Sequence, residues 1–329
     1  MQNMPAAPWT WALALALAIG LQSSAGCAAG FPDRPVKLIV PGATASDVDV
    51  ISRLVADRLA KVWNQPVLID NRSGGAGLIA TQAAAAATSD GYTLYLAQAS
   101  TFTIVPYVGP ASPIDPMQAF VPIAFVAEIP FGFAVEAARG KRSLADLIKF
   151  AADNPEKLDV GTGFVGGLNN LAGEMFARRA GVRVHIVPYR TGALADLLGG
   201  RLDMSITGVA GLAGQVAAGK LRLLAVTSDR RLPHFPDVPT VREFVPGFVA
   251  VGWFALFAPS GTPATVVQRI HDDVKHVLED PELGARLANL GAIPRYMSAE
   301  ELAAFIRKER EVWGPMAQEF EAKGNEPAK

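Results

Sequence analysis

The chain has 329 residues, of which 50% are apolar and 19% are charged, and its formal net charge is −1. This length and apolar content suffice for two domains with separate cores and argue against a disordered chain. Because the charge is nearly balanced and no basic stripe is present, we expect no nucleic acid partner.

Residues 1–30 differ in character from the rest of the chain. Trp9–Leu21 is an apolar run of signal-peptide length, followed by polar and then small residues. No lysine or arginine precedes this run, so an uncleaved anchor is the alternative. The only cysteine, Cys27, stands where a lipoprotein signal places its acylated cysteine, but Ser24 replaces the usual leucine. We expect cleavage rather than lipidation, and a periplasmic mature protein.

The first strand is expected at Lys37–Val40, where Pro41 and Gly42 stop an apolar run. A loop of small residues follows, and Ser46 or Asp47 can cap the next helix. That helix has a core face of apolar residues at helical spacing: Val48, Ile51, Val55, Leu59 and Val62. Free amide groups in such a loop suit an anion, although an ordinary β-α turn has the same pattern.

Two further strands are expected at Pro66–Asp70 and Tyr92–Ala97, and a small polar loop follows at residues 98–101. The glycine-rich turn Asn71–Gly77 has neither the G-x-G-x-x-G order nor the lysine of a phosphate loop. Its glycines indicate positive φ angles or close packing instead. Three β-α units in succession predict a parallel sheet with helices on its faces.

The second half of the chain repeats the opening unit. We place the passage to a second domain between the apolar runs Phe120–Ala127 and Phe131–Glu136. Leu158–Val160 is then a strand, and a small-residue loop leads to the helix Leu168–Arg179. Phe248–Phe257 is the return strand. Two such units predict two lobes that face one cleft, with the ligand at the carboxyl ends of the strands.

From Phe31 to Phe320 the sequence resembles the Bug family, the extracytoplasmic solute receptors of tripartite tricarboxylate transporters. The matching stretches include FPDRPVKLIVP (31–41), VLIDNRSGGAG (67–77), VPYRTG (187–192) and WFALFAPSGTP (253–263). The resemblance implies an α/β fold, a type II periplasmic-binding-protein-like Venus flytrap whose two lobes each have a mainly parallel sheet flanked by helices. Lobe 1 would comprise residues 31–127 plus 247–329, and lobe 2 residues 128–246.

The sequence departs from the family pattern at the ligand loops. Gly42 replaces an aromatic residue, Ala45 and Ser46 replace two glycines, Asn170 replaces a histidine, and Thr207 stands where the family often has aspartate. The loop after VPYR is also about two residues shorter than usual. Since an anionic group and an aromatic wall are lost, we expect simple or aromatic carboxylates to bind better than aspartate or glutamate.

The resemblance implies binding of a small organic acid and its delivery to membrane transporter subunits by a monomer without cofactor or metal. The candidate ligand residues are Gly42, Thr44, Ala45, Ser46, Ser100, Thr101, Thr162, Gly163, Gly166, Gly167, Asn170 and Thr207. A receptor that presents ligand to a sensor kinase is the alternative. We expect no catalytic residues, because His271 and His276 lack metal-pair spacing and the sequence has no nucleophile elbow.

Overall fold

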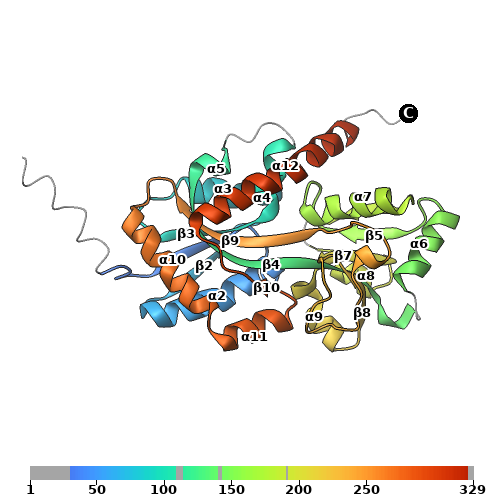
Figure 1. Cartoon of the computed structure of the whole chain (residues 1–329), viewed down its shortest axis with the longest axis horizontal. Helices are drawn as coiled ribbons and strands as arrows, with labels where there is room; N and C mark the ends of the chain where they lie inside the picture. The colour runs from blue at the N-terminus through green and yellow to red at the C-terminus, as the bar shows by residue number, and fades with distance from the viewer. Residues whose placement is uncertain (1–29, 109–113, 140–142, 190–191, 325–329) are drawn as a thin grey trace, which may run out of the picture.

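The computed structural model describes residues 30–108, 114–139, 143–189 and 192–324 (Figure 1). The expected signal segment up to residue 29, with Cys27, lies outside the described residues, as do Arg190 and Thr191 of the shortened loop. The chain forms two α/β lobes side by side along the long axis, and the long strands β4 and β9 run through the centre (Figure 1).

Lobe 1 is built on three parallel strands, β1 (Val36–Val40), β2 (Val67–Asn71) and β3 (Thr93–Gln98), with β1 in the middle. This parallel arrangement confirms the prediction from the three β-α units. The antiparallel strand β9 (Val251–Pro259) pairs with the free edge of β3. The strand order across both lobes is β2-β1-β3-β9-β4-β7-β5-β6.

The two apolar runs expected on either side of the domain passage are one strand, β4 (Phe120–Glu136). Its first part pairs with β9 as far as Pro130, and its second part pairs with β7 from Phe131 onward. Its second part also pairs with β8 (Leu221–Val226). The strand continues through the passage because it exchanges one partner for another there, and no backbone turn is needed.

Lobe 2 has a parallel core of β5 (Asp159–Thr162) between β6 (His185–Pro188) and β7 (Met204–Gly208). Its helices are α6 (Leu144–Asp153), α7 (Leu168–Ala180), α8 (Leu194–Leu198) and α9 (Val209–Ala217). In Figure 1 these elements form the right-hand half of the molecule.

The helices of lobe 1 are α2 (Asp47–Trp63), α3 (Leu78–Ala85), α4 (Ala99–Thr103), α5 (Pro116–Ala119), α10 (Ala264–Leu278), α11 (Pro281–Asn289) and α12 (Ala299–Gly324), with the short strand β10 (Ile293–Pro294). The segment expected as a polar loop after β3 is thus helical. Its buried hydroxyls bond backwards, as Thr101 Oγ1 donates to the Gln98 carbonyl at 2.6 Å.

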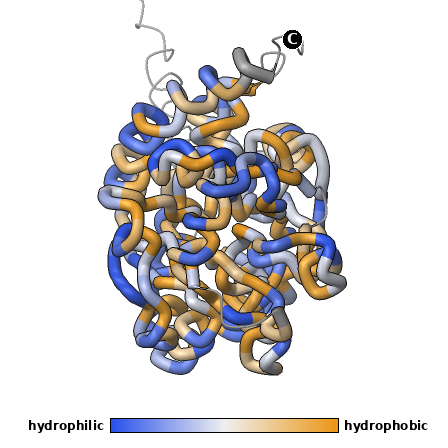
Figure 2. Tube along the Cα trace, turned by 90° about the vertical axis from the view of Figure 1, so that its right-hand side faces the viewer, coloured by the Kyte–Doolittle hydropathy of each residue, from blue (hydrophilic) through white to orange (hydrophobic). Residues whose placement is uncertain are grey.

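The core face expected for α2 is correct except at its last position. Val48, Ile51, Val55 and Leu59 are buried, but Val62 is 39% exposed. Trp63 is buried in its place, since its ring packs on Phe31 and its indole N–H donates to Asp273 at 2.7 Å. Hydrophilic stretches lie mainly on outer turns, as Figure 2 shows. No helix among the described residues is both long and apolar enough to span a bilayer.

Thr227 ties the two crossings between the lobes together. Its hydroxyl accepts from the Phe131 amide at 2.8 Å and donates to the Ala250 carbonyl. Its own amide donates to the Phe131 carbonyl at 2.9 Å, and its carbonyl accepts from the Ala250 amide at 3.1 Å. Because Thr227 is fully buried, these four bonds fix β4 and the start of β9 at the passage between the lobes.

Candidate functional site

The carboxyl ends of β1 and β7 meet across the boundary between the lobes. The loop after β1 (residues 41–46, the first-lobe loop) leads into α2, whose first residue is Asp47. Its carboxylate lies directly against Gly208 at the end of β7, where a built Cβ would overlap Oδ2. A Cβ on Gly211 of α9 would lie 3.7 Å from Oδ1. Asp47 of lobe 1 therefore faces the start of α9 in lobe 2.

The buried carboxylate of Asp49 stabilises the first-lobe loop through hydrogen bonds. It is 2% exposed and accepts from the Ala45 amide at 2.8 Å and from Asn71 Nδ2 at 3.0 Å. Asn71 also donates to the Gly42 carbonyl at 3.1 Å. Ala45 has a φ of 66°, a left-handed conformation that glycine adopts without strain and that alanine adopts only when its neighbours hold it.

The charge of Asp49 is compensated within lobe 1. Burial alone would raise the pKa of Asp49, but hydrogen bonds from Arg53, the Ala45 amide and Asn71 hold it below its ordinary value. Arg53 lies 2.8 Å from Asp49 Oδ1. The carboxylate is therefore a fixed part of the loop, and its bonding capacity is used internally.

The loop after β5 (residues 163–167, the second-lobe loop) is held in a similar way. Thr162 and Asn170 are both 1% exposed, and Asn170 Nδ2 donates to Thr162 Oγ1 at 3.1 Å. Asn170 Oδ1 accepts from the Gly166 amide at 3.3 Å. Asn169, which the sequence reasoning did not single out, donates to the Ile206 carbonyl at 3.1 Å. Asn170 thus connects this loop to β5, and Asn169 connects α7 to β7.

The structure distributes the candidate ligand residues over three places. Thr44, Ala45 and Ser46 belong to the first-lobe loop. Ser46 Oγ donates to the Ala43 carbonyl at 2.7 Å, and the Ser46 side chain makes no capping bond to a described residue of α2. Thr207 precedes Gly208 in β7, and Gly208 is the residue that Asp47 contacts. Gly163, Gly166 and Gly167 lie in the second-lobe loop, whose Gly166 comes close to Val108 of lobe 1.

Ser100 and Thr101 form the third place, on α4 at the carboxyl end of β3. Both are buried, with 4% and 3% exposure, and Thr101 packs against Gly77, whose φ is 93°. Burial raises the pKa of the neighbouring Tyr95 to about 12, although bonds to Thr81 and Thr101 oppose that shift. The contacts of Thr101 therefore belong to the packing of lobe 1.

Asp47 is the charged group at the lobe boundary that the sequence did not single out, because its position suggested only a helix cap. Burial raises the pKa of Asp47, and a bond from its own amide lowers it only partly. No cation among the described residues pairs with it: on α2, Arg53 is bonded to Asp49 and Asn71, and α9 contains no charged residue. The signal available in the sequence was a second carboxylate two residues before Asp49.

Comparisons with known proteins place the chain in a family. The model of the tripartite tricarboxylate transporter family receptor, TctC, matches residues 51–322. The chain belongs to the TctC receptor family. BugT of Bordetella pertussis is 31% identical over 297 residues, which are 89% of this chain and 91% of BugT. The predicted resemblance to the Bug family is thereby confirmed.

Two solved structures show the same fold. The R. palustris protein Rpa4515, solved with adipate, has a TM-score of 0.84 at 32% identity and covers 88% of this chain and 98% of its own. MatC from Rhodopseudomonas palustris, solved with bound malate, has a TM-score of 0.79 at 28% identity and covers 87% of this chain and 100% of its own. The predicted two-lobed α/β fold is confirmed.

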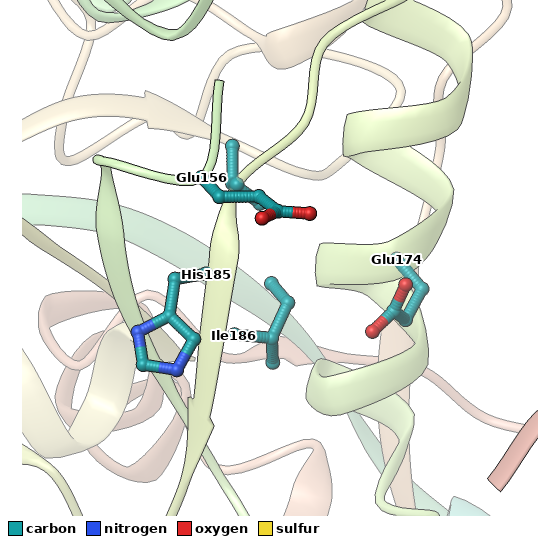
Figure 3. A pocket seen from close by; sticks show the side chains of 5 residues that line it. Glu156, Glu174, His185 and Ile186 are labelled. Carbon is teal, nitrogen blue, oxygen red and sulfur yellow. The ribbon is translucent and has the colours of Figure 1, made fainter. Parts of the chain in front are cut away.

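A hollow of this TctC receptor lies at the end of the second-lobe sheet opposite the second-lobe loop. Glu156, Glu174, Val184, His185 and Ile186 line it, and Figure 3 shows Glu156 and Glu174 separated across it. His185 begins β6, so the hollow is at the amino ends of strands, away from the cleft loops. The described residues hold no group of three or more His, Cys, Asp or Glu that could bind a metal.

Proposed function

We propose that this chain binds a small organic carboxylate between its lobes, outside the cytoplasm, and delivers it to a tripartite tricarboxylate-type membrane transporter. Membership of the TctC receptor family carries this proposal. The structures of Rpa4515 with adipate and MatC with malate support a carboxylate as the ligand class. A signal segment within residues 1–30 would direct export, and cleavage would remove Cys27.

The cleft loops supply the chemistry for an anion. α2 has 17 residues and α7 has 13, so both are long enough to carry a dipole, and their N-termini follow the two loops. Since the side chains of Ser46, Thr162 and Asn170 bond within their own loops, backbone amides and ordered water would make most direct contacts with the carboxylate. The side chains keep those amides in place.

Closure would bring these loops onto the ligand. We assign residues 31–127 plus 247–329 to lobe 1 and residues 128–246 to lobe 2. The exchange of partners in β4 at Pro130 and the bonds of Thr227 support a hinge at this point. Two chain crossings suit hinge closure around a ligand.

The decisive experiment identifies the ligand. Native mass spectrometry of the monomeric protein from its own periplasm should show a bound small acid, and a thermal-shift screen of mono- and dicarboxylates should name its class. Saturating ligand should lower the radius of gyration in solution scattering. A screen in which no carboxylate raises the melting temperature would refute the proposal. Copurification with the permease subunits would favour transport over presentation to a sensor kinase.

A further inference from the structure

Asp47 is a titratable group at the lobe boundary that makes none of the hydrogen bonds holding the first-lobe loop. It does not hold the first-lobe loop, because Asp49 and Asn71 do that. Its carboxylate instead points away from lobe 1 and packs on Gly208 of lobe 2. Gly208 directly follows Thr207, and a built Cβ on Gly211 would lie within 4 Å of both Asp47 Oδ1 and Thr207 Cγ2.

No cation in the described part of the chain pairs with Asp47. Asp47 is partly exposed between the lobes, and closing the lobes over its carboxylate without a donor would be costly. Nearby Arg53 is 2.8 Å from Asp49 Oδ1 and bonds to Asn71 as well. On the facing side, β7 and α9 contain only uncharged residues from Met204 to Ala217. Among the described residues, no side chain donates a hydrogen bond to Asp47, so a hydroxyl or ammonium group of a bound ligand can do so.

We propose that Asp47 is a specificity-determining residue that accepts a hydrogen bond from a hydroxyl or ammonium group on the carbon skeleton of the bound carboxylate. This inference rests on the proposed function and narrows its ligand class to hydroxy- and amino-substituted acids. It differs from the sequence-based expectation of an uncharged or apolar tail, with simple or aromatic carboxylates favoured over aspartate or glutamate. That expectation noted the anionic group lost at Thr207, whereas Asp47 brings one from the opposite lobe to the neighbouring Gly208.

Closure over a ligand without a hydrogen-bond donor for Asp47 has an energetic cost. When the lobes meet, an unsubstituted acid leaves the Asp47 carboxylate buried without a donor and adds a second negative charge near it. A ligand hydroxyl or ammonium satisfies Asp47 and lowers that cost. Sites built to bond a ligand OH or NH discriminate strongly against the analogue that lacks it, because their own polar group is left unpaired.

The test uses three ligands with one four-carbon skeleton: succinate, L-malate and L-aspartate. We expect calorimetry on the mature wild-type chain to show malate or aspartate binding at least about tenfold more tightly than succinate. Asp47→Asn, which keeps size but removes charge, should weaken aspartate binding about tenfold or more and should strengthen succinate binding, because the unpaired charge is gone. Asp47→Ala repeats the test with a side chain that cannot bond. Asp57→Asn is the matched control, an exposed aspartate on the same helix.

The outcomes separate the inference from the proposed function. Tightest binding of succinate by the wild type, or equal changes for all three ligands in both Asp47 variants, would overturn the inference alone. A screen that yields only unsubstituted carboxylates as ligands would do the same. If the wild-type protein binds no carboxylate at all, the proposed function fails and the inference fails with it.

Discussion

Asp47 and Asp49 both lie in the first turn of α2, two residues apart, but their carboxylates contact different lobes. Asp49 is enclosed in lobe 1 with Arg53, Asn71 and the Ala45 amide, whereas Asp47 lies against Gly208 of the other lobe. Burial raises the pKa of Asp47, while the hydrogen bonds of Asp49 outweigh burial and lower its pKa. One carboxylate therefore holds the loop, and the other is left to face the cleft.

Asp49→Asn should destabilise the protein, because Arg53 loses its ionic partner and the bonds to the Ala45 amide and Asn71 become weaker. We expect a loss of about 1–3 kcal/mol in urea unfolding at pH 7. The lowered pKa means that the contribution of Asp49 is present above its ordinary value of 3.8 and is lost as the pH falls through the lowered value.

The control for this prediction is Asp57→Asn, which removes one side of an exposed pair with Lys61 on the same helix. We expect it to change stability by less than about 0.5 kcal/mol, as is usual for surface positions. Equal stability of the Asp49 and Asp57 variants at pH 7 would show that Asp49 does not hold the loop.

Asp47→Asn should have the opposite effect on stability. Because burial raises the pKa of Asp47, its favourable contribution is complete below the ordinary value of 3.8 and is lost as the pH rises through the raised value. The other charged groups near it on α2 are Asp49 and Arg53, which are paired. Without ligand, Asp47→Asn should therefore melt at a higher temperature than the wild type at pH 7, and the difference should shrink towards pH 4. A variant that melts lower at pH 7 would contradict this.

Gly208→Ala should prevent the lobes from meeting at the cleft. Its φ of −53° suits alanine, so the effect is steric: the new methyl overlaps Asp47 Oδ2 and lies 3.3 Å from Ile129. We expect at least about tenfold weaker ligand binding, in line with the usual cost of overpacking. The radius of gyration with ligand should also be larger than for the wild type.

Gly214→Ala is the matched control on the same helix. Outside the adjoining residues and helix backbone, no described heavy atom lies within 4 Å of its built Cβ. It should keep ligand affinity and gain up to about 1 kcal/mol from helix propensity. Since the overlap involves the Asp47 carboxylate, Asp47→Ala should restore scattering-detected closure to Gly208→Ala. If Gly208→Ala alone closes as the wild type does, the predicted clash between residue 208 and Asp47 would be disproved.

Much of the fold follows from local pattern. The strand at β1 and the helix α7 were predictable because an apolar run or a helical period ends at a proline or glycine, and Gly181 indeed has a φ of 67°. Ser143 and Asp146, three residues apart, form a capping box at the start of α6, which is also a local pattern. These signals depend on neighbours a few residues away, which the sequence shows directly.

The remaining features depend on contacts between distant segments. The continuity of β4 follows from its change of partners, which no local pattern reveals. The burial of Trp63 in place of Val62 depends on Asp273 of α10. The role of Asp47 depends on Gly208 in the other lobe. The candidate ligand side chains were chosen by residue type, and the sequence could not show that Thr162 and Asn170 bond to each other.

Thr162→Ala and Asn170→Ala should each weaken carboxylate binding by about 1–3 kcal/mol, because each leaves a buried polar group unpaired. The two side chains bond directly at 3.1 Å, so the double variant should lose less than the sum of the single losses. Calorimetry on the three variants gives the coupling energy. Strict additivity would mean that each residue contacts the ligand independently.

Thr227→Val should loosen the hinge. The change keeps the shape of the side chain but removes the hydroxyl that bonds the Phe131 amide and the Ala250 carbonyl. Both backbone groups would then be buried without that partner, at a cost of about 1–3 kcal/mol in urea unfolding. The Phe131 amide should exchange hydrogen faster, which amide exchange read by mass spectrometry can localise to β4.

Thr227→Ser distinguishes the effect of the hydroxyl from that of the methyl group. It keeps both hydrogen bonds and loses one buried methyl group, so we expect a cost of about 1 kcal/mol and unchanged exchange at Phe131. If the hydroxyl fixes the passage between the lobes, only the valine variant should broaden the scattering-derived range of lobe arrangements without ligand. Faster exchange at Phe131 in both variants would assign the effect to packing and not to the hydroxyl.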